Sequence, residues 1–407
     1  MMSRTVCSRV FGLLLNSRPL PLAKTLVPMS SLSSSSNEPE VLFETVKSPS
    51  GESGYRLMTL NKPKTLNALS GNMIDLLTTD MKSVVPDNSI NFMLVRGGEK
   101  AFCAGGDIRR VTEAGKTGSP LAQTFFFREY QLNYLTGTVH KPYIALISGI
   151  TMGGGVGISV HSPYRVATET TTFAMPETAI GFFPDVGGGY FLPRLKGELG
   201  MYLALTGHRL KGRDVLHGGI ATHLIGKEKI PSLLSELTKS CDDPIMKKDP
   251  HYVVKSILDK YHKESLNIDD RSFSLTPHLE LIDKCFSGGS VEDIQMSLLN
   301  DGSDWSINQL QLLSKMSPTS LKVTHRQLRE GREKSFEDCL MTDYRLCQRF
   351  MEDKDFYEGV RAVLVDRDNN PKWDPPTLAD VTKETLDRYF SPLSDQEELH
   401  VKHISKL

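Results

Sequence analysis

The sequence has no excess of charge and no long hydrophobic run, and both absences exclude classes of partner. Its 48 lysines and arginines balance 49 aspartates and glutamates, which gives a net charge of −1 at pH 7. No overall electrostatic field therefore attracts nucleic acid or an anionic membrane surface. No stretch of about 18 apolar residues occurs, so no transmembrane helix is predicted. We expect neither a nucleic-acid partner nor insertion into a membrane.

Cysteine is scarce and scattered along the chain. The six cysteines form no CxxC pair and no close cluster with histidine; they lie at positions 7, 103, 241, 285, 339 and 347. This spacing argues against a disulfide framework and against a structural zinc site. We therefore expect no bound metal and a reducing compartment.

Acidic residues are absent from the first part of the chain, where the first one is Glu38. Serines crowd positions 30–36, and the basic residues before them are Arg4, Arg9, Arg18 and Lys24. A basic, serine-rich and acid-poor segment is typical of a mitochondrial transit peptide. The alternatives are a secretory signal with a short apolar run or a disordered leader. We predict that residues 1–40 are a transit peptide or a disordered leader, with the mitochondrial matrix as destination.

The rest of the chain divides into a mixed part and a helical part. Residues 41–230 alternate strand-like and helical runs, which indicates an α/β layered core. The expected strands are 55–60, 92–95 and 143–148, with a helix at 72–84 and a loop at 149–155 that leads into another helix. Residues 231–407 form a mostly helical C-terminal region, which we expect to pack on the core.

One helix of the C-terminal region is marked at both ends. Ser317 is a predicted N-cap, Pro318 occupies the first helical position, and Gly331 is a plausible stop. Trp373 lies among prolines that forbid a helix, so its segment is predicted to be extended.

Two acids in an apolar setting are the strongest indication of chemistry. Glu177 and Asp185 lie eight residues apart, with Gly181 and Pro184 between them. Glycine and proline break any helix or strand, so the chain can fold back and bring both acids to one cavity. Two carboxylates in an apolar pocket can differ in protonation state, as acid–base or nucleophilic catalysis requires.

Two glycine-rich segments follow predicted strands, at 104–106 and at 149–157. Small residues before a helix allow a ligand to approach the backbone amides. Each segment alone could be an ordinary tight turn, and the second is a weak match to a dinucleotide-binding motif. Together, two such junctions can each offer one amide to a single carbonyl oxygen and so form an oxyanion hole.

These segments resemble the crotonase superfamily of acyl-CoA enzymes, in the order in which that family has them: Leu60 to Leu69, Lys100 to Ile108, Gly149 to Gly157, and Pro176 to Gly188. Further similarity extends to about Trp373. The resemblance implies a spiral of ββα units followed by helices, and a coenzyme A thioester as substrate. It also implies that the amides of Ala104 and Gly154 form the oxyanion hole.

Differences within the family point to a reaction. Gly157 stands where hydratases have a catalytic glutamate, and Asp185 stands where they usually have glycine. This combination resembles hydrolases and implies cleavage of 3-hydroxyisobutyryl-CoA to 3-hydroxyisobutyrate and coenzyme A in valine catabolism. Glu177 is then the nucleophile or general base, and Asp185 binds the substrate hydroxyl, orients Glu177 or handles the water proton. A structural hydrogen bond from Asp185 to the turn amides at 187–189 is the alternative.

The resemblance also assigns binding residues. Glu129 lies on a helix that borders the acyl pocket, although a solvated charge beside Arg128 is equally compatible with its pattern. The residues implied to contact coenzyme A are Lys62, Lys64, Ala101, Asp107 and Ile108. No cofactor is expected, because coenzyme A is part of the substrate and product, and a homo-oligomer is possible. An isomerase of the same superfamily and a non-catalytic binding member remain alternatives.

Overall fold

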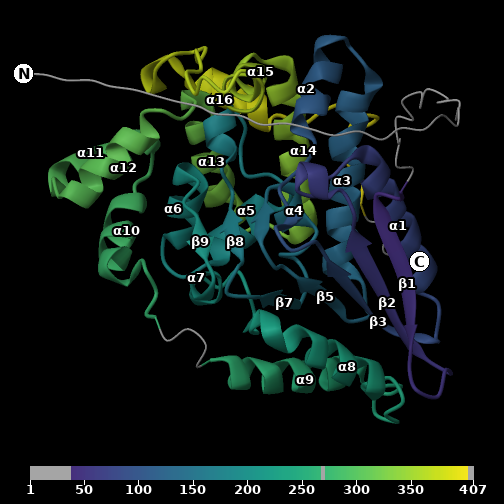
Figure 1. The fold of residues 1–407 in the computed structure, drawn as a ribbon. Helices are drawn as coiled ribbons and strands as arrows, with labels where there is room; N and C mark the ends of the chain where they lie inside the picture. The colour runs from purple at the N-terminus through teal and green to yellow at the C-terminus, as the bar shows by residue number, and fades with distance from the viewer. Residues whose placement is uncertain (1–37, 267–270, 402–407) are drawn as a thin grey trace, which may run out of the picture. The chain divides into compact units, whose positions relative to one another are not determined.

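The computed structural model in Figure 1 describes residues 38–266 and 271–401. The predicted leader lies outside these residues, apart from positions 38–40. No helix in the described ranges combines the length and the apolar character that crossing a bilayer demands.

The strands form two sheets. The larger sheet has six strands in the spatial order β1 (Val41–Lys47), β2 (Gly54–Leu60), β3 (Ile90–Arg96), β5 (Tyr143–Leu146), β7 (Tyr164–Ala167) and β10 (His223–Leu224). The smaller sheet has four strands in the order β4 (Ala101–Cys103), β6 (Ile150–Met152), β8 (Thr172–Ala174) and β9 (Leu210–Lys211). Only the β1–β2 and β8–β9 pairs are antiparallel.

Consecutive strands from β3 to β8 enter the two sheets alternately. Each strand–strand unit thus adds one strand to each sheet, and the chain advances as a spiral. The helices of these units are α1 (Gly71–Val84), α2 (Ile108–Lys116), α3 (Pro120–Thr138) and α4 (Gly154–Gly157). The expected α/β fold with a spiral of ββα units is confirmed.

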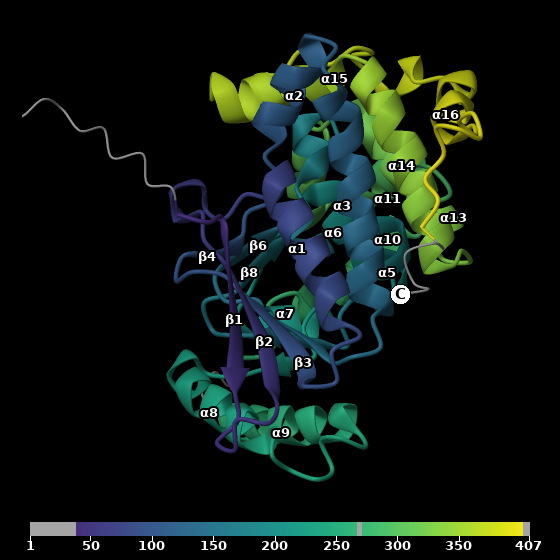
Figure 2. The same cartoon turned by 90° about the vertical axis from the view of Figure 1, so that its right-hand side faces the viewer.

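The central strands β3 and β5 of the larger sheet are almost entirely buried, because both faces of the sheet are covered there, whereas the edge strand β1 has exposed residues. Tyr55 and Leu57 of β2 pack with α8 (Ile230–Ser240) and α9 (Pro250–Ser265) in one core cluster. Met58 and Leu60 of the same strand belong to the main cluster on the other face. Figure 2 shows α8 and α9 side by side at one end of the molecule, with α1 and α3 standing together at the sheet.

The described part of the C-terminal region is mainly helical. After α9 it contains α10 (Leu279–Phe286), α11 (Val291–Asp301), α12 (Asp304–Leu313), α13 (Pro318–Gly331), α14 (Phe336–Glu352), α15 (Asp355–Val360), the π-helix η6 (Arg361–Val365) and α16 (Lys383–Phe390), besides two short 3₁₀ helices. The predicted boundaries of α13 are confirmed, since Ser317 Oγ caps it by accepting the amide of Ser320. Trp373 lies in a segment without helix, as predicted, and its indole N–H donates to the carbonyl of Lys315.

One expectation about the core was wrong. The stretch 149–155 was expected to be a loop, but it contains β6, which pairs with β4 and β8. A strand of three residues is too short to show an alternating pattern, so the glycines around it dominated the prediction. The helix that follows, α4, begins at Gly154.

Candidate active site

The spiral brings three turns to one edge of the smaller sheet. Because β4, β6 and β8 are neighbouring parallel strands, their carboxyl ends lie side by side. Gly105 and Gly106 follow β4, Gly153 and Gly154 follow β6, and Glu177 follows β8. The sheet therefore assembles segments that are about 70 residues apart in the sequence. Open α/β sheets characteristically bind ligands at such an edge.

A cavity of about 350 Å³ lies at this edge. Three acids line it, namely Glu129 from α3, Glu177 from the 3₁₀ helix η2 (Glu177–Ile180), and Asp185. Their exposed fractions are 1%, 6% and 5%. Gly181, at φ +68°, ends η2 in a left-handed conformation and allows the chain to return from Glu177 toward Asp185. The structure therefore brings both acids of the pair to one cavity, together with Glu129.

The alternative for Glu129, a solvated helical charge, is wrong, because this side chain is buried. The neighbouring Arg128 points elsewhere and forms an ion pair with Asp75 at 2.7 Å.

The backbone of the first glycine turn corrects one assignment. The amide of Ala104 donates to the carbonyl of Leu66 at 3.0 Å, so it has no proton left for a ligand. Leu69 donates to the carbonyl of Gly105 and accepts from the amide of Asp107, each at 2.8 Å. This parallel bridge turns the intervening amide of Gly106 away from Leu69. The amide of Gly106, two residues beyond Ala104, is therefore available to a ligand.

The amide of Gly106 faces the second glycine turn. A Cβ atom placed on Gly154 would lie 3.2 Å from the Gly106 nitrogen. Gly154 is the first residue of α4, so its own N–H lies outside the hydrogen-bond pattern of the helix. Both glycines line the acid cavity. Two backbone amides from different strand ends thus lie next to each other beside the acids.

Burial sets the protonation of the three acids. Loss of solvent raises the pKa of Glu177 and of Glu129 well above the usual range, and the nearby Asp185 raises both further. Burial also raises the pKa of Asp185, to about 7, although the hydroxyl of Tyr130 opposes this effect by donating to Oδ2 at 2.8 Å. A buried cluster of like charges is unfavourable. Near neutral pH the cavity therefore disfavours ionisation of all three acids at once.

The alternative role for Asp185, a structural hydrogen bond to the turn amides at 187–189, is not supported by the contacts of this turn. The amide of Gly187 donates to Oδ2 of Asp343 at 2.8 Å, and the amide of Gly188 donates to the backbone carbonyl of Asp185 at 2.8 Å. The Asp185 carboxylate instead accepts from Tyr130. The sequence pattern did not identify Tyr130, although it directly follows Glu129 and has a polar group on an apolar ring.

The wall of the cavity includes residues from the C-terminal region. Val363 and Leu364 of η6 line it, together with Phe182 and the exposed Arg209. None of these four was predicted. Val363 and Leu364 reach the cavity from about 180 residues further along the chain. No local sequence signal records such a contact.

The residues implied to bind coenzyme A are only partly brought together. Ile108 lines the acid cavity, whereas Ala101 is buried in β4 with its carbonyl accepting from Asn67. Nζ of Lys62 lies 3.9 Å from Oδ2 of Asp107. Lys64 is exposed on the same loop.

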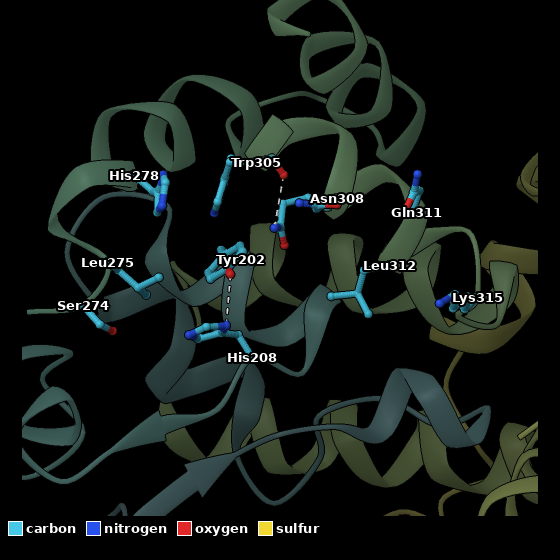
Figure 3. Close-up of a pocket in the computed structure, with 11 residues that line it drawn as sticks. Tyr202, His208, Ser274, Leu275, His278, Trp305, Asn308, Gln311, Leu312 and Lys315 are labelled. Atoms are coloured by element: carbon cyan, nitrogen blue, oxygen red, sulfur yellow. Dashed lines mark hydrogen bonds between the residues drawn. The ribbon is translucent and has the colours of Figure 1, made fainter. Parts of the chain in front are cut away.

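A second cavity, of about 550 Å³, lies between α6 (Leu199–Thr206) and α12. Figure 3 shows His278 stacked on Trp305, with ring centroids 5.0 Å apart, and Tyr202 bonded to His208. No carboxylate lines this cavity, so it offers no acid pair. The cavity at the sheet edge, by contrast, combines buried acids with two glycine turns.

Other groups considered for catalysis have structural surroundings. Burial raises the pKa of Cys103 to about 12, so its thiol stays protonated. His161 lies behind the Asp185 turn, where its Nε2–H donates to the carbonyl of Val186 at 2.7 Å. Among the described residues, no group of three or more histidine, cysteine, aspartate or glutamate side chains could hold a metal ion.

Comparison with known proteins gives consistent matches. A family model described as enoyl-CoA hydratase/isomerase matches residues 55–390. A Danio rerio protein named 3-hydroxyisobutyryl-CoA hydrolase, mitochondrial, is 52% identical over 359 residues, which are 88% of this chain and 91% of that protein. A Homo sapiens protein of the same name is 51% identical over 342 residues, or 84% and 87% of the two chains. The solved structure of a carnitinyl-CoA dehydratase from Mycobacterium thermoresistibile matches with a TM-score of 0.77 and 34% identity, covering 90% of this chain and 99% of that one.

Proposed function

The chain belongs to the enoyl-CoA hydratase/isomerase family, and from this premise we propose that it hydrolyses 3-hydroxyisobutyryl-CoA to 3-hydroxyisobutyrate and coenzyme A. The observation that supports hydrolysis is the pairing of Glu177 and Asp185 in one buried cavity, with glycine at position 157. The relatives named for this reaction have about half of their residues in common with this chain.

The amides of Gly106 and Gly154 polarise the thioester carbonyl. In the transition state the carbonyl oxygen gains negative charge, and two fixed N–H donors stabilise that charge. Each such donor contributes about 3–4 kcal/mol. The donors need no reorganisation, because the strand ends of β4 and β6 already hold the two turns in place.

Glu177 acts on the carbonyl carbon. As a nucleophile it forms a mixed anhydride and releases coenzyme A, after which water opens the anhydride. As a general base it takes a proton from water, which attacks the carbon directly. In both routes the thiolate of coenzyme A leaves and takes up a proton. Asp185, whose pKa is about 7, exchanges protons readily at neutral pH and is the group that we assign to this transfer.

Glu129 binds the hydroxyl group of the acyl chain. Its Oε1 atom is buried and has no hydrogen-bond partner among the described residues. The same atom lies against Gly154, at the oxyanion amides, because a Cβ on that glycine would meet it. A substrate hydroxyl a few bonds from the thioester carbonyl can therefore reach this carboxyl group.

We also propose how coenzyme A is bound and where in the cell the reaction takes place. Coenzyme A enters as part of the substrate, with Lys62, Lys64, Asp107 and Ile108 as its contacts, and no further cofactor takes part. The mitochondrial matrix is the location, in agreement with the names of the relatives. Sedimentation analysis of the purified chain measures whether it forms a homo-oligomer.

A panel of acyl-CoA thioesters tests the proposed function. Purified protein should release free thiol from 3-hydroxyisobutyryl-CoA much faster than from isobutyryl-CoA, which differs only in lacking the hydroxyl group. An enoyl-CoA in the panel tests the isomerase alternative by the shift of its double bond. Double-bond migration without thiol release would establish an isomerase, and binding of every thioester without turnover would establish a non-catalytic member of the fold.

A further inference from the structure

The turn that contains Asp185 has an unusual backbone. Val186 has φ +52° and Gly187 has φ +83°, so two successive residues are left-handed. A β-branched residue rarely adopts this conformation, because its side chain crowds the backbone. Such a conformation persists only where surrounding groups hold it. The position of Asp185 therefore depends on what holds Pro184 to Gly187.

Two side chains from the C-terminal region hold this turn on both sides of Asp185. Nε2 of Gln327, on α13, donates to the carbonyl of Pro184 at 2.9 Å and to Oδ1 of Asp343 at 2.7 Å. Oδ2 of Asp343, on α14, accepts the amide of Gly187 at 2.8 Å. We call Gln327 and Asp343 the clamp.

The clamp is buried and its hydrogen bonds are specific. The exposed fractions of Gln327 and Asp343 are 2% and 0%. Both partners of Nε2 are oxygen atoms, which fixes the orientation of the amide. A Cβ placed on Gly189 would lie 3.2 Å from Cγ of Gln327, so α13 also packs directly on the segment after the turn.

Neither clamp residue lines the acid cavity. The carboxylate of Asp185 accepts a hydrogen bond from Tyr130, and the carbonyl of Val186 accepts one from His161. The clamp thus acts on the backbone, whereas Tyr130 acts on the side chain. Its residues are positioning residues and do not touch the reacting atoms.

We propose that Gln327 and Asp343 position Asp185 for catalysis, so that the C-terminal helices complete an active site whose other parts come from strand ends. This inference rests on the proposed function for the reaction that it affects. Catalysis is sensitive to such positioning, since a displacement of about 1 Å can lower the rate about 100-fold.

The test compares Gln327→Met and Asp343→Asn with Gln309→Met. Met replaces a buried glutamine at nearly constant size in both helices, but Gln309 donates only to Trp305 on its own helix. With 3-hydroxyisobutyryl-CoA, both clamp variants should lower kcat about 10- to 100-fold and leave KM nearly unchanged, because the coenzyme A contacts lie elsewhere. Gln309→Met should retain the kcat of the wild type.

A second measurement needs no substrate. Hydrogen exchange in peptides that cover residues 181–191 should be faster in both clamp variants, because the amide of Gly187 loses its acceptor or that acceptor is displaced. Thermal unfolding identifies a variant that fails to fold. If Gln327→Met fails to fold, the kcat and the hydrogen exchange of Asp343→Asn, which changes one atom, decide whether the clamp positions Asp185.

The outcomes separate the two proposals. Wild-type kcat and wild-type exchange in the clamp variants would overturn the inference, as would an equal loss of kcat in Gln309→Met. If the wild type cleaves no thioester, the proposed function fails, and hydrogen exchange alone decides whether the clamp holds the Asp185 turn.

Discussion

Gly157 lies in α4 where a side chain has no room. A Cβ atom at this position would be 2.7 Å from Nδ2 of Asn133 and 2.7 Å from Cβ of Val186. Val186 belongs to the turn that positions Asp185, so it cannot move without displacing that acid. The glutamate that hydratases have at this position is therefore sterically excluded here, and the space is used by Asn133.

Replacing Gly157 with alanine should lower the free energy of unfolding by about 1–3 kcal/mol, because the methyl group overpacks the site. Gly98→Ala is the control, since a Cβ at Gly98 meets no atom within 4 Å. Chemical denaturation of both variants measures the difference. Equal stability of Gly157→Ala and the wild type would show that Asn133 and Val186 can move to accommodate the methyl group, and the steric argument would then be wrong.

The sequence was sufficient to identify the acids and the glycine turns, but not to identify which backbone amide of the first turn is free to bind a ligand. Glu177, Asp185 and the two glycine segments were predicted to converge, because helix-breaking residues and strand ends have local signatures. Gly106 was missed in favour of Ala104, since the free amide depends on the bridge to Leu69. That bridge is a tertiary contact, and the spacing of the motif does not reveal it.

At the scale of elements, α13 connects the active site to α15 through its N-cap. Oγ of Ser317 accepts the amide of Ser320 at 3.0 Å and donates to Oδ2 of Asp355 at 2.6 Å, and both bonds are buried. The cap therefore fixes the start of the helix that contributes Gln327, and it also satisfies a buried carboxylate.

Replacing Ser317 with alanine should cost about 2–4 kcal/mol, because the cap is lost and a buried acceptor loses its donor. Ser335→Ala is the matched control, since Ser335 caps α14 in the same way but is exposed. It should cost about 0.5–1 kcal/mol. Urea unfolding of the two variants measures both values, and equal losses would contradict the role of the buried bond to Asp355.

The elements that the sequence predicted best were those with long patterns. The strand β2 and the helix α1 were found because their apolar residues repeat over 7 and 14 residues. The strand β6 was missed because it has 3 residues between glycines. Short strands of this kind form because neighbouring turns of the spiral supply their partners.

At the scale of the whole molecule, the buried acids link stability to pH. The folded-state pKa of Asp185 is raised by burial to about 7, above its unfolded value of about 3.8–3.9. The folded chain therefore holds a proton that the unfolded chain loses between about pH 4 and pH 7. The contribution is fully present below the unfolded pKa and is lost as the pH rises through the folded pKa.

The variant Asp185→Asn removes this titration. Relative to the variant, the wild type should lose stability as the pH rises from about 4 to about 7, with a slope of at most about 1.4 kcal/mol per pH unit. Taking the difference between the two proteins cancels the titration of surface carboxylates. Denaturant unfolding over this range measures it, and a difference that is constant with pH would show that Asp185 titrates normally.

The most direct test of the central claim, that Glu177 cleaves a thioester, is free-thiol release from 3-hydroxyisobutyryl-CoA by Glu177→Gln. We predict that turnover falls at least about 100-fold, because neither nucleophilic attack nor general-base catalysis is open to the amide. Binding of the thioester should remain measurable, and Glu113→Gln, which alters an exposed acid on α2, should match the wild type. Turnover of Glu177→Gln equal to that of the wild type would contradict the account.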